Sequence, residues 1–333
     1  MLREEMLSYL AALDLNSRLP IYVISYGRAG TAPLLNNATK WTRQDDVNVV
    51  VRVSQAAEYR AAYPTFNIRP LPDDMIPSCG AARWGALDLA LLTDGEEEAI
   101  LMDDDVLHTR FLFQREFFTG KNAGLECSGH NTLEDTSILP DTEERVVAAM
   151  GQVGREVFAA HPNAVLGSMI KQHMSFSYKN HRTKYVLNGG ATPRQAMVWH
   201  PGRLADHGVR LDLEKFGVHG EDIGAIAAIL AAGLDCFSMP SFVLDHWPEA
   251  VNINRSSIRN AETAARFHAE ELEALMEYPI RDYLRQKRSK IDGSYEWGDV
   301  NWAALHRIRG TEALWVPWHE DQPSQGPAEN LLL

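Results

Sequence analysis

Short apolar runs alternate with amphipathic segments along the first third of the chain. The runs are compact and rich in β-branched and aliphatic residues, which is typical of strands buried on both faces. They occupy 21–25, 47–51 and 99–102. The segments 32–40 and 81–92 lie between them and carry apolar residues at helical spacing. Strands that alternate with helices predict an α/β fold with a doubly wound, mostly parallel sheet.

The rest of the chain continues this pattern with longer interruptions. A helix is predicted at 1–18, and Gly, Asn, Ser and Asp make 119–142 an irregular loop. The remaining predicted elements are a helix at 143–160, strands within 164–200, a helix at 221–232, an extended segment at 236–244 and a long charged helix at 260–290.

Composition restricts the class of protein. The chain has 333 residues, a net charge of −13 and three cysteines without CxxC spacing, which argues against a disulfide framework and a cysteine-rich zinc site. Its start lacks a signal-peptide pattern and its apolar stretches are too short to span a bilayer, so we expect a cytoplasmic protein with no membrane partner. The acidic balance argues against nucleic-acid binding through the overall field, although it leaves room for a local basic groove.

Candidate chemistry gathers where two predicted strands end. Tyr26–Gly30 follows the first strand, and Asp103–Asp105 follows the third. In doubly wound sheets, ligands bind beyond the carboxyl ends of the strands. Alternation along extended chain directs Asp103 and Asp105 to one side and Asp104 to the other. Carboxylate oxygens suit Mg²⁺ or Mn²⁺, which take phosphate oxygens as further ligands. The alternative is a turn or helix cap built from aspartates.

A resemblance to a known family rests on five segments in the same order. The set resembles the GT-A class of nucleotide-sugar glycosyltransferases, whose mark is an Asp-X-Asp motif at the end of a strand in a Rossmann-like half. The matching segments are Ile21–Arg28, Ser78–Gly85, Ile100–Val106, His219–Ile223 and Asp245–Trp247. This resemblance implies a GT-A-like catalytic domain at 1–255, with a nucleotide-binding half at 20–110 and an acceptor half at 111–255, followed by a C-terminal helical extension and tail at 256–333.

The resemblance also implies a donor site. A UDP-sugar, with UDP-glucose as the family default, would bind at the carboxyl edge together with Mn²⁺ or Mg²⁺. Arg28 and Arg83 are candidates for the diphosphate or base, since a guanidinium fork matches phosphate geometry. The other residues assigned to the donor are Ser25, Tyr26, Asp103 and Asp104.

Metal ligation is assigned to Asp105, Asp103 and His246. His246 corresponds to the late histidine that completes the metal site in many members of the resembled class. Imidazole tolerates Mn²⁺ better than Mg²⁺, so this histidine favours manganese. The alternative for His246 is a buried histidine that packs beside Trp247.

Catalysis is assigned to Asp222, with Glu221 beside it at the start of a predicted helix. An inverting transfer needs a carboxylate to take the proton of the acceptor hydroxyl. In a retaining enzyme, Asp222 would only position the acceptor. Alternatively, both acids only stabilise the helix N-terminus, where carboxylates are favoured by the helix dipole.

More narrowly, the set looks like the phage glycosyltransferases associated with TET/JBP dioxygenases. This implies transfer to 5-hydroxymethylpyrimidines, such as 5-hydroxymethylcytosine, in double-stranded DNA, as a DNA modification in the host cytoplasm. A protein or glycan acceptor, a nucleotidyltransferase and a non-catalytic nucleotide- or sugar-binding module remain alternatives. The nucleotidyltransferase should carry a Gly-rich phosphate loop, of which 26–30 is a poor version.

Overall fold

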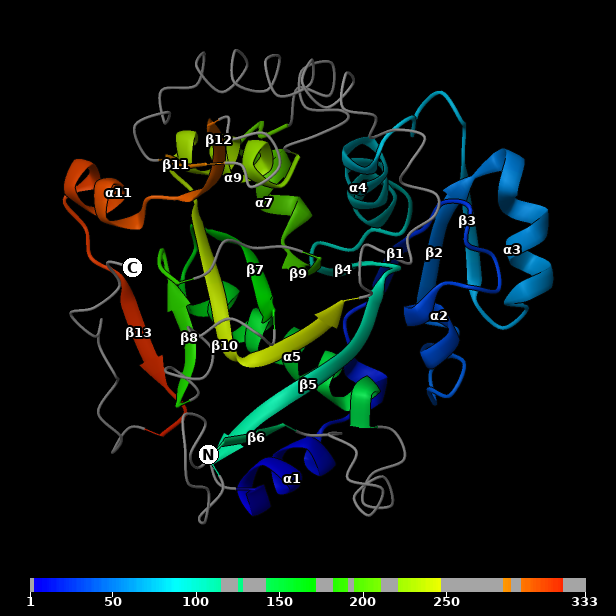
Figure 1. Cartoon of the computed structure of the whole chain (residues 1–333), viewed down its shortest axis with the longest axis horizontal. Helices are drawn as coiled ribbons and strands as arrows, with labels where there is room; N and C mark the ends of the chain where they lie inside the picture. Colours follow the sequence, from blue (N-terminus) through cyan, green and yellow to red (C-terminus); the bar gives the residue numbers. More distant parts are fainter. Residues whose placement is uncertain are drawn as a thin grey trace.

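One large mixed β-sheet organises the chain in this computed structural model (Figure 1). Among the described residues, eleven strands join it, and the order along the main path is β13-β8-β10-β7-β9-β4-β1-β2-β3. The structure describes residues 3–114, 125–127, 142–171, 182–190, 195–210, 221–246, 284–288 and 295–319. The α/β fold class predicted from the alternating pattern is confirmed.

The half of the sheet formed by β3, β2, β1 and β4 is parallel throughout. Its strands are β1 (Ile21–Ile24), β2 (Val47–Arg52), β3 (Asn67–Leu71) and β4 (Ala99–Asp103). The helices that connect them are α2 (Pro33–Ala38), α3 (Ala56–Ala62) and α4 (Cys79–Asp88), and α4 continues into a π-helical turn at Leu89–Thr93. All three predicted apolar runs are therefore strands in register with one another.

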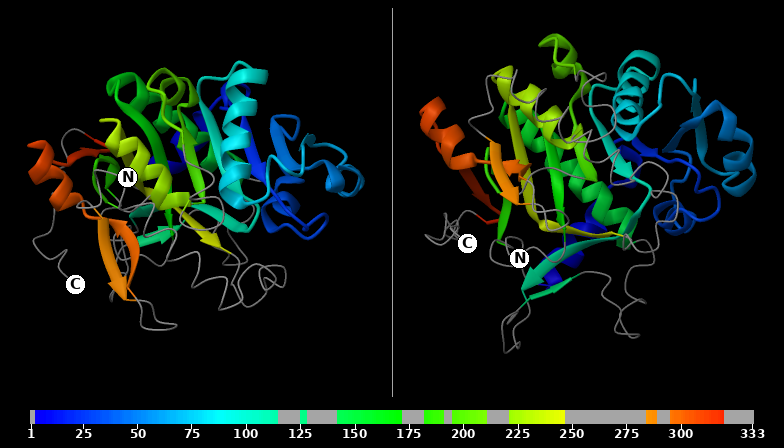
Figure 2. Two further views of the ribbon diagram at one scale, coloured as in Figure 1. Left: turned by 90° about the horizontal axis from the view of Figure 1, so that it is seen from above. Right: turned by 45° about the horizontal axis from the view of Figure 1, so that its top comes forward.

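The other half of the sheet is mixed. Antiparallel β9 (Ala196–Trp199) separates β4 from β7 (Ala164–Lys171), and β7 pairs in parallel with β10 (Asp235–His246). The remaining strands of this sheet are β5 (Val106–Gln114), β6 (Leu125–Cys127), β8 (Thr183–Leu187) and β13 (Leu314–Pro317). Figure 2 shows β13 and β3 at opposite ends of the array.

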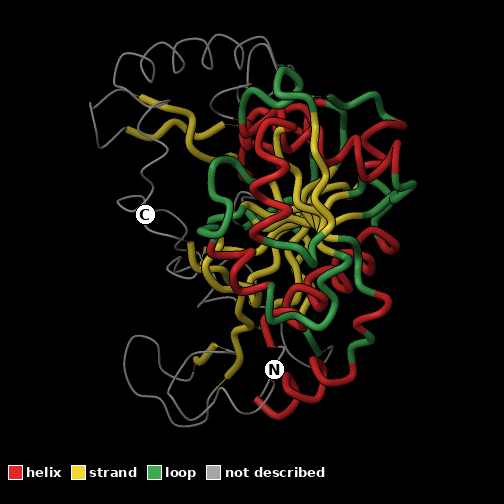
Figure 3. Tube along the Cα trace, turned by 90° about the vertical axis from the view of Figure 1, so that its right-hand side faces the viewer, coloured by secondary structure: helices red, strands yellow, loops and turns green. Residues whose placement is uncertain are grey.

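Helices cover both faces of the sheet, because each strand buries side chains alternately on either side (Figure 3). On β1, Ile21 and Val23 pack into the core cluster that includes α2, α3 and α5 (Thr142–Ala160), whereas Tyr22 and Ile24 pack into the cluster that includes α4 and α9 (Glu221–Ala231). Two further helices complete the described elements near the sheet, α1 (Arg3–Ala12) and α7 (Pro201–Asp206). In the described residues, no helix has the length and apolar character that crossing a membrane requires.

Several elements differ from the sequence-based expectation. The chain forms α3 and β3 between the second predicted strand and the predicted helix at 81–92, in a stretch without a predicted element, and Leu125–Cys127 in the predicted loop is a strand. The prediction of a helix at 260–290 is wrong for residues Leu284–Arg288. They form strand β11, which pairs with β12 (Tyr295–Val300). The reason is that this charged segment finds a strand partner, and tertiary pairing overrides helical propensity. The rest of that predicted helix lies outside the described residues.

The C-terminal segment also adds to the main sheet. Residues 256–333 were expected to form a helical extension and tail, and α11 (Trp302–Arg309) is a helix there. However, β13 pairs with β8, so this part of the chain supplies an edge strand. Residues 320–333 lie outside the described residues.

Close approach of β7 to β10 requires glycine at position 167. A Cβ placed on Gly167 would lie 2.1 Å from two ring atoms of Phe237, its register partner on β10. We predict that Gly167→Ala lowers the free energy of unfolding by about 1–3 kcal/mol, the range typical of overpacking. Guanidinium denaturation measures this.

The control is the same substitution in a Phe237→Leu background, where the ring is absent and the cost of Gly167→Ala should shrink. An equal cost in both backgrounds would show that another contact is responsible.

Candidate functional site

The strand order reverses between β1 and β4, and this reversal defines the ligand edge of the sheet. The chain proceeds from β1 to β2 and β3 on one side, and then crosses to β4 on the other side. The loops after β1 and β4 therefore diverge at their carboxyl ends, which is where doubly wound sheets bind ligands. Ile24 is in register with Asp103, so both loops begin at the same level. The segments predicted from sequence, 26–30 and 103–105, lie at this point.

A buried polar network joins the two loops. Asp104 accepts a hydrogen bond from the Ser25 hydroxyl and forms an ion pair with Arg28. The Ser25 hydroxyl also shares a 2.6 Å hydrogen bond with the Tyr59 hydroxyl, which in turn accepts from the Arg28 backbone N–H at 3.0 Å. Asp104 thus ties down the β1 loop and turns away from Asp103, as strand alternation predicts.

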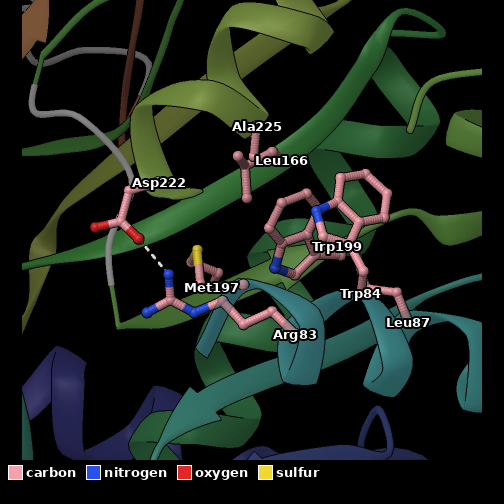
Figure 4. A pocket seen from close by; sticks show the side chains of 9 residues that line it. Arg83, Trp84, Leu87, Leu166, Met197, Trp199, Asp222 and Ala225 are labelled. Carbon is pink, nitrogen blue, oxygen red and sulfur yellow. Dashed lines mark hydrogen bonds and ion pairs between the residues drawn. The ribbon is translucent and has the colours of Figure 1, made fainter. Parts of the chain in front are cut away.

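Arg83 holds the opposite face of the cluster. It lies on α4, a helix whose first turn is capped by the Ser78 hydroxyl, which accepts from Ala81 N–H at 3.2 Å. The Arg83 guanidinium contacts both oxygens of Asp103, at 2.8 and 3.0 Å, and also pairs with Asp222 on α9. Figure 4 shows Arg83 and Asp222 directed toward each other. One guanidinium therefore connects β4, α4 and α9.

Burial raises the proton affinity of two carboxylates at this edge. The pKa of Asp103 is raised to about 6, mainly by burial, which Arg83 opposes and to which the charges of Asp105 and Asp222 add. Burial likewise raises the pKa of Asp104 to about 7, against the lowering effects of Arg28 and the Ser25 hydrogen bond. Among the described ion pairs, the three carboxylates of Asp103, Asp104 and Asp222 pair with two arginines, so the paired groups offer more negative than positive charge, which favours a further cation.

The backbones of Asp105 and His246 lie near each other at this edge. Asp105 is 2% exposed and lies next to Val106, the first residue of β5. His246 ends β10 and is the register partner of Val106, so its backbone lies beside the end of the acidic cluster. Sequence spacing alone does not give this proximity, because more than a hundred residues separate the two strands. The side chains of His246 and Glu221 lie outside the description, although their backbones end β10 and begin α9.

The residues at this edge offer ligand atoms of the kind that a divalent cation binds. Asp103 and Asp105 supply hard oxygens, and His246 lies on the adjacent strand. Among the described side chains, however, no group of three or more His, Cys, Asp or Glu is arranged to hold a metal. Asp103, predicted as a ligand, is paired with Arg83, predicted to contact the donor. A cation bound to Asp103 would have to share that carboxylate with Arg83 or displace it.

A small apolar pocket lies beside the Arg83–Asp222 ion pair (Figure 4). It has room for about one water molecule. Its lining comes from α4, β7, β9 and α9 and comprises Gly80, Arg83, Trp84, Leu87, Leu166, Met197, Trp199, Asp222 and Ala225. Trp84 and Trp199 form its aromatic wall, with ring centroids 6.3 Å apart. The pocket therefore places apolar side chains beside the ion pair and is too small to hold a sugar.

Tyr26, a predicted donor residue, makes its described ring contact with Arg52 and not with this network. Tyr26 is 48% exposed, and the guanidinium of Arg52 lies 4.4 Å from its ring centroid. Its described contact is therefore on the solvent side of the β1 loop. Because Tyr26 is exposed, a ligand could reach it, but no contact in the described part of the chain gives it a role in binding.

Two residues at this edge escaped sequence analysis. Tyr59 was missed because the short α3 helix has no strong apolar period, although its hydroxyl organises the β1 loop. Gln195 was missed because a lone glutamine before a strand carries no motif. Its backbone carbonyl accepts a 2.8 Å hydrogen bond from Asp103 N–H.

Comparisons with known proteins add little beyond the fold. No protein-family model and no curated protein sequence matches the chain. Two solved structures are similar at 10% identity and a TM-score of 0.34. One, described as a mannose-1-phosphate geranyltransferase from Thermus thermophilus, aligns over 68% of this chain and 75% of its own. The other, described as a nucleotide-diphospho-sugar transferase from Desulfovibrio desulfuricans, aligns over 77% and 95%. Similarity at this level carries no argument about activity.

Proposed function

We propose that this chain is a glycosyltransferase that moves a sugar from a UDP-sugar to a hydroxyl acceptor with the help of a divalent cation. One observation carries the proposal: carboxylates from β4 and α9 and arginines from the β1 loop and α4 converge at the reversal point of the sheet. A diphosphate needs both groups, since arginines bind its oxygens directly and carboxylates bind it through a metal ion.

The arginines would meet the donor's diphosphate. Arg28 and Arg83 are 13% and 8% exposed, so a phosphate placed beside them would be attracted with little screening by water. Both are already held by carboxylates, which fixes their guanidinium planes before a ligand arrives. The donor's binding free energy would therefore not be spent on ordering them.

Asp103, Asp105 and His246 would hold the cation. Bound there, Mn²⁺ or Mg²⁺ would act as a Lewis acid and stabilise the charge that develops on the departing diphosphate. The feature of this edge that supports a cation is that three carboxylates, those of Asp103, Asp104 and Asp222, pair with two arginines among the described side chains.

Asp222 would act as the general base, and Glu221 lies next to it at the start of α9. The acceptor hydroxyl oxygen attacks the anomeric carbon as the bond from that carbon to the diphosphate oxygen breaks. The bonding electron pair leaves with the diphosphate, and the hydroxyl proton moves to Asp222. The Asp222 side chain is 27% exposed, so an acceptor can reach it, and its ion pair with Arg83 fixes its orientation.

Double-stranded DNA carrying hydroxymethylated pyrimidines is the acceptor we propose, on the resemblance to phage enzymes. A hydroxymethyl group offers the primary hydroxyl that the reaction needs. A protein or glycan hydroxyl satisfies the same chemistry, and the net charge of −13 disfavours DNA except through a local basic surface.

Donor binding is predicted to depend on metal. UDP with Mn²⁺ should raise the melting temperature, because a ligand that binds only the native state stabilises it by about 2.7 kcal/mol at a hundred times its Kd. UDP alone should have a much smaller effect. Differential scanning fluorimetry measures both, and Asp105→Asn should abolish the metal-dependent part. Asp45→Asn is the matched control, since Asp45 is 75% exposed and precedes β2 at the opposite edge. Equal shifts with and without Mn²⁺ would contradict the metal assignment.

Replacing the base should separate binding from turnover. Asp222→Asn keeps the shape of the side chain and leaves Arg83 paired with Asp103. We expect UDP-sugar affinity to stay within a few-fold, while the transfer rate falls about 10²–10⁴-fold, the usual contribution of general base catalysis. Calorimetry and a transfer assay give the two quantities, again with Asp45→Asn as control. An unchanged rate would exclude Asp222 as the base.

Salt dependence should identify the acceptor class. If the acceptor is DNA, its affinity should fall steeply as the salt concentration rises, because bound counterions are released from the phosphates on binding. Steady-state KM for hydroxymethylated duplex DNA, measured at several salt concentrations, provides the slope. A flat response, or transfer to a glycan or protein with no turnover on DNA, would rule out the DNA assignment and leave the donor site intact.

A further inference from the structure

Gln195 adjoins the candidate site from the β9 side of β4, and β1 is the neighbour of β4 on its other side. It directly precedes β9, which runs antiparallel to β4, so the start of β9 lies beside the carboxyl end of β4. The backbone hydrogen bond from Asp103 N–H to the Gln195 carbonyl, 2.8 Å long, fixes the two residues against each other. Gln195 is thus a backbone neighbour of the acidic cluster at the ligand edge.

The backbone of Gln195 adopts a conformation that costs free energy. Its φ of 63° lies in the left-handed region, which costs a residue with a Cβ about 1–2 kcal/mol. Asn188 is the other non-glycine residue with positive φ in the described part of the chain. Hydrogen bonds of its side chain compensate Asn188 for this conformation. The side-chain NH₂ group of Asn188 donates to Asp235 at 2.7 Å, and its side-chain oxygen accepts from Cys236 N–H at 3.2 Å.

The side chain of Gln195 has no such compensation within the described residues. Gln195 is 8% exposed, and its Oε1 is buried without a hydrogen-bond partner there. An unsatisfied buried acceptor costs about 1–3 kcal/mol. Strained backbone and an unsatisfied polar atom therefore coincide in one residue beside Asp103. Such residues persist where a ligand completes them.

The chemistry of Oε1 restricts what that ligand group is. An amide oxygen accepts hydrogen bonds and needs an O–H or N–H donor. Ionised phosphates and carboxylates offer only acceptors, and the arginines at this edge already provide donors for them. A sugar hydroxyl both donates and accepts, so it satisfies the Gln195 oxygen and can receive from the Gln195 NH₂ group.

We propose that the side-chain amide of Gln195 binds a hydroxyl of the donor's sugar and contributes to sugar specificity. This inference rests on the proposed function, because it requires that the site bind a UDP-sugar. Gln195 would then contact the sugar, whereas the aspartates and arginines would act at the diphosphate. Its role is that of a specificity residue, and the proton and the diphosphate are handled by other groups.

The test is Gln195→Met, which keeps the length and approximate volume of the side chain and removes the amide. Isothermal titration calorimetry with UDP, UDP-glucose, UDP-galactose and UDP-xylose, all with Mn²⁺, gives four affinities for each protein. We expect UDP affinity to stay within twofold of wild type. Affinity for the preferred UDP-sugar should fall about five- to tenfold, the loss of one net hydrogen bond.

The comparison among sugars locates the contact. The wild-type chain should distinguish the preferred UDP-sugar from the analogue that lacks or inverts the contacted hydroxyl, and Gln195→Met should bind the two nearly equally. A second variant, Gln195→Gly, guards against misfolding, since glycine adopts positive φ without strain. Gln195→Gly should melt above wild type without ligand and show the same loss of sugar discrimination.

Unchanged sugar affinities in both variants would overturn the inference, as would an equal loss of affinity for UDP itself, which would indicate a structural role. The proposed function fails in a different way: a wild-type chain that binds none of the four nucleotides would remove both the donor site and this inference. If the wild-type chain binds UDP and all three UDP-sugars with the same affinity, only the proposed Gln195 contact is overturned.

Discussion

Compensation of crowded carboxylates by arginines is the interaction on which the rest of this edge depends. Asp103 and Asp104 at the end of β4 lie near Asp222 on α9, and Arg28 and Arg83 pair with these three carboxylates. Without these guanidiniums, the buried negative charges would repel one another and carry a large desolvation cost. Burial raises the pKa values of Asp103 and Asp104 in spite of these arginines, which reflects that desolvation cost. In the proposed function, the remaining negative charge is what a cation would neutralise.

The sheet makes this arrangement possible by separating the two halves of the cluster. Asp104 points to the face where Tyr59 and the β1 loop lie, and Asp103 points to the face where α4 and α9 lie. One loop can therefore be tied down through Asp104 while Asp103 and Asp222 remain at the edge. In the proposed reaction, Arg28 of the β1 loop would contact the donor from one face, and Arg83 of α4 and the proposed base on α9 would act from the other.

Strain and unsatisfied polarity mark the third side, at the start of β9. Gln195 is held against Asp103 by the backbone, yet its side-chain oxygen has no partner among the described residues. The apolar pocket between α4 and α9 has room for about one water molecule beside the Arg83–Asp222 pair, in which Arg83 is 8% and Asp222 27% exposed. In the proposed site, the charged groups are therefore ordered in advance, and the proposed specificity for the sugar rests on Gln195.

Local signals in the amino-acid sequence account for part of this structure. The runs at 21–25, 47–51 and 99–102 are predictable as strands, and the three aspartates after the last run are predictable at the sheet edge, because periodicity and strand alternation act over a few residues. Tertiary contacts account for the pairing of Arg83 with both Asp103 and Asp222, for the position of His246 beside Val106, and for the strand at Leu284–Arg288. These outcomes depend on pairing between segments far apart in the chain, which the register of the sheet fixes and no local pattern encodes.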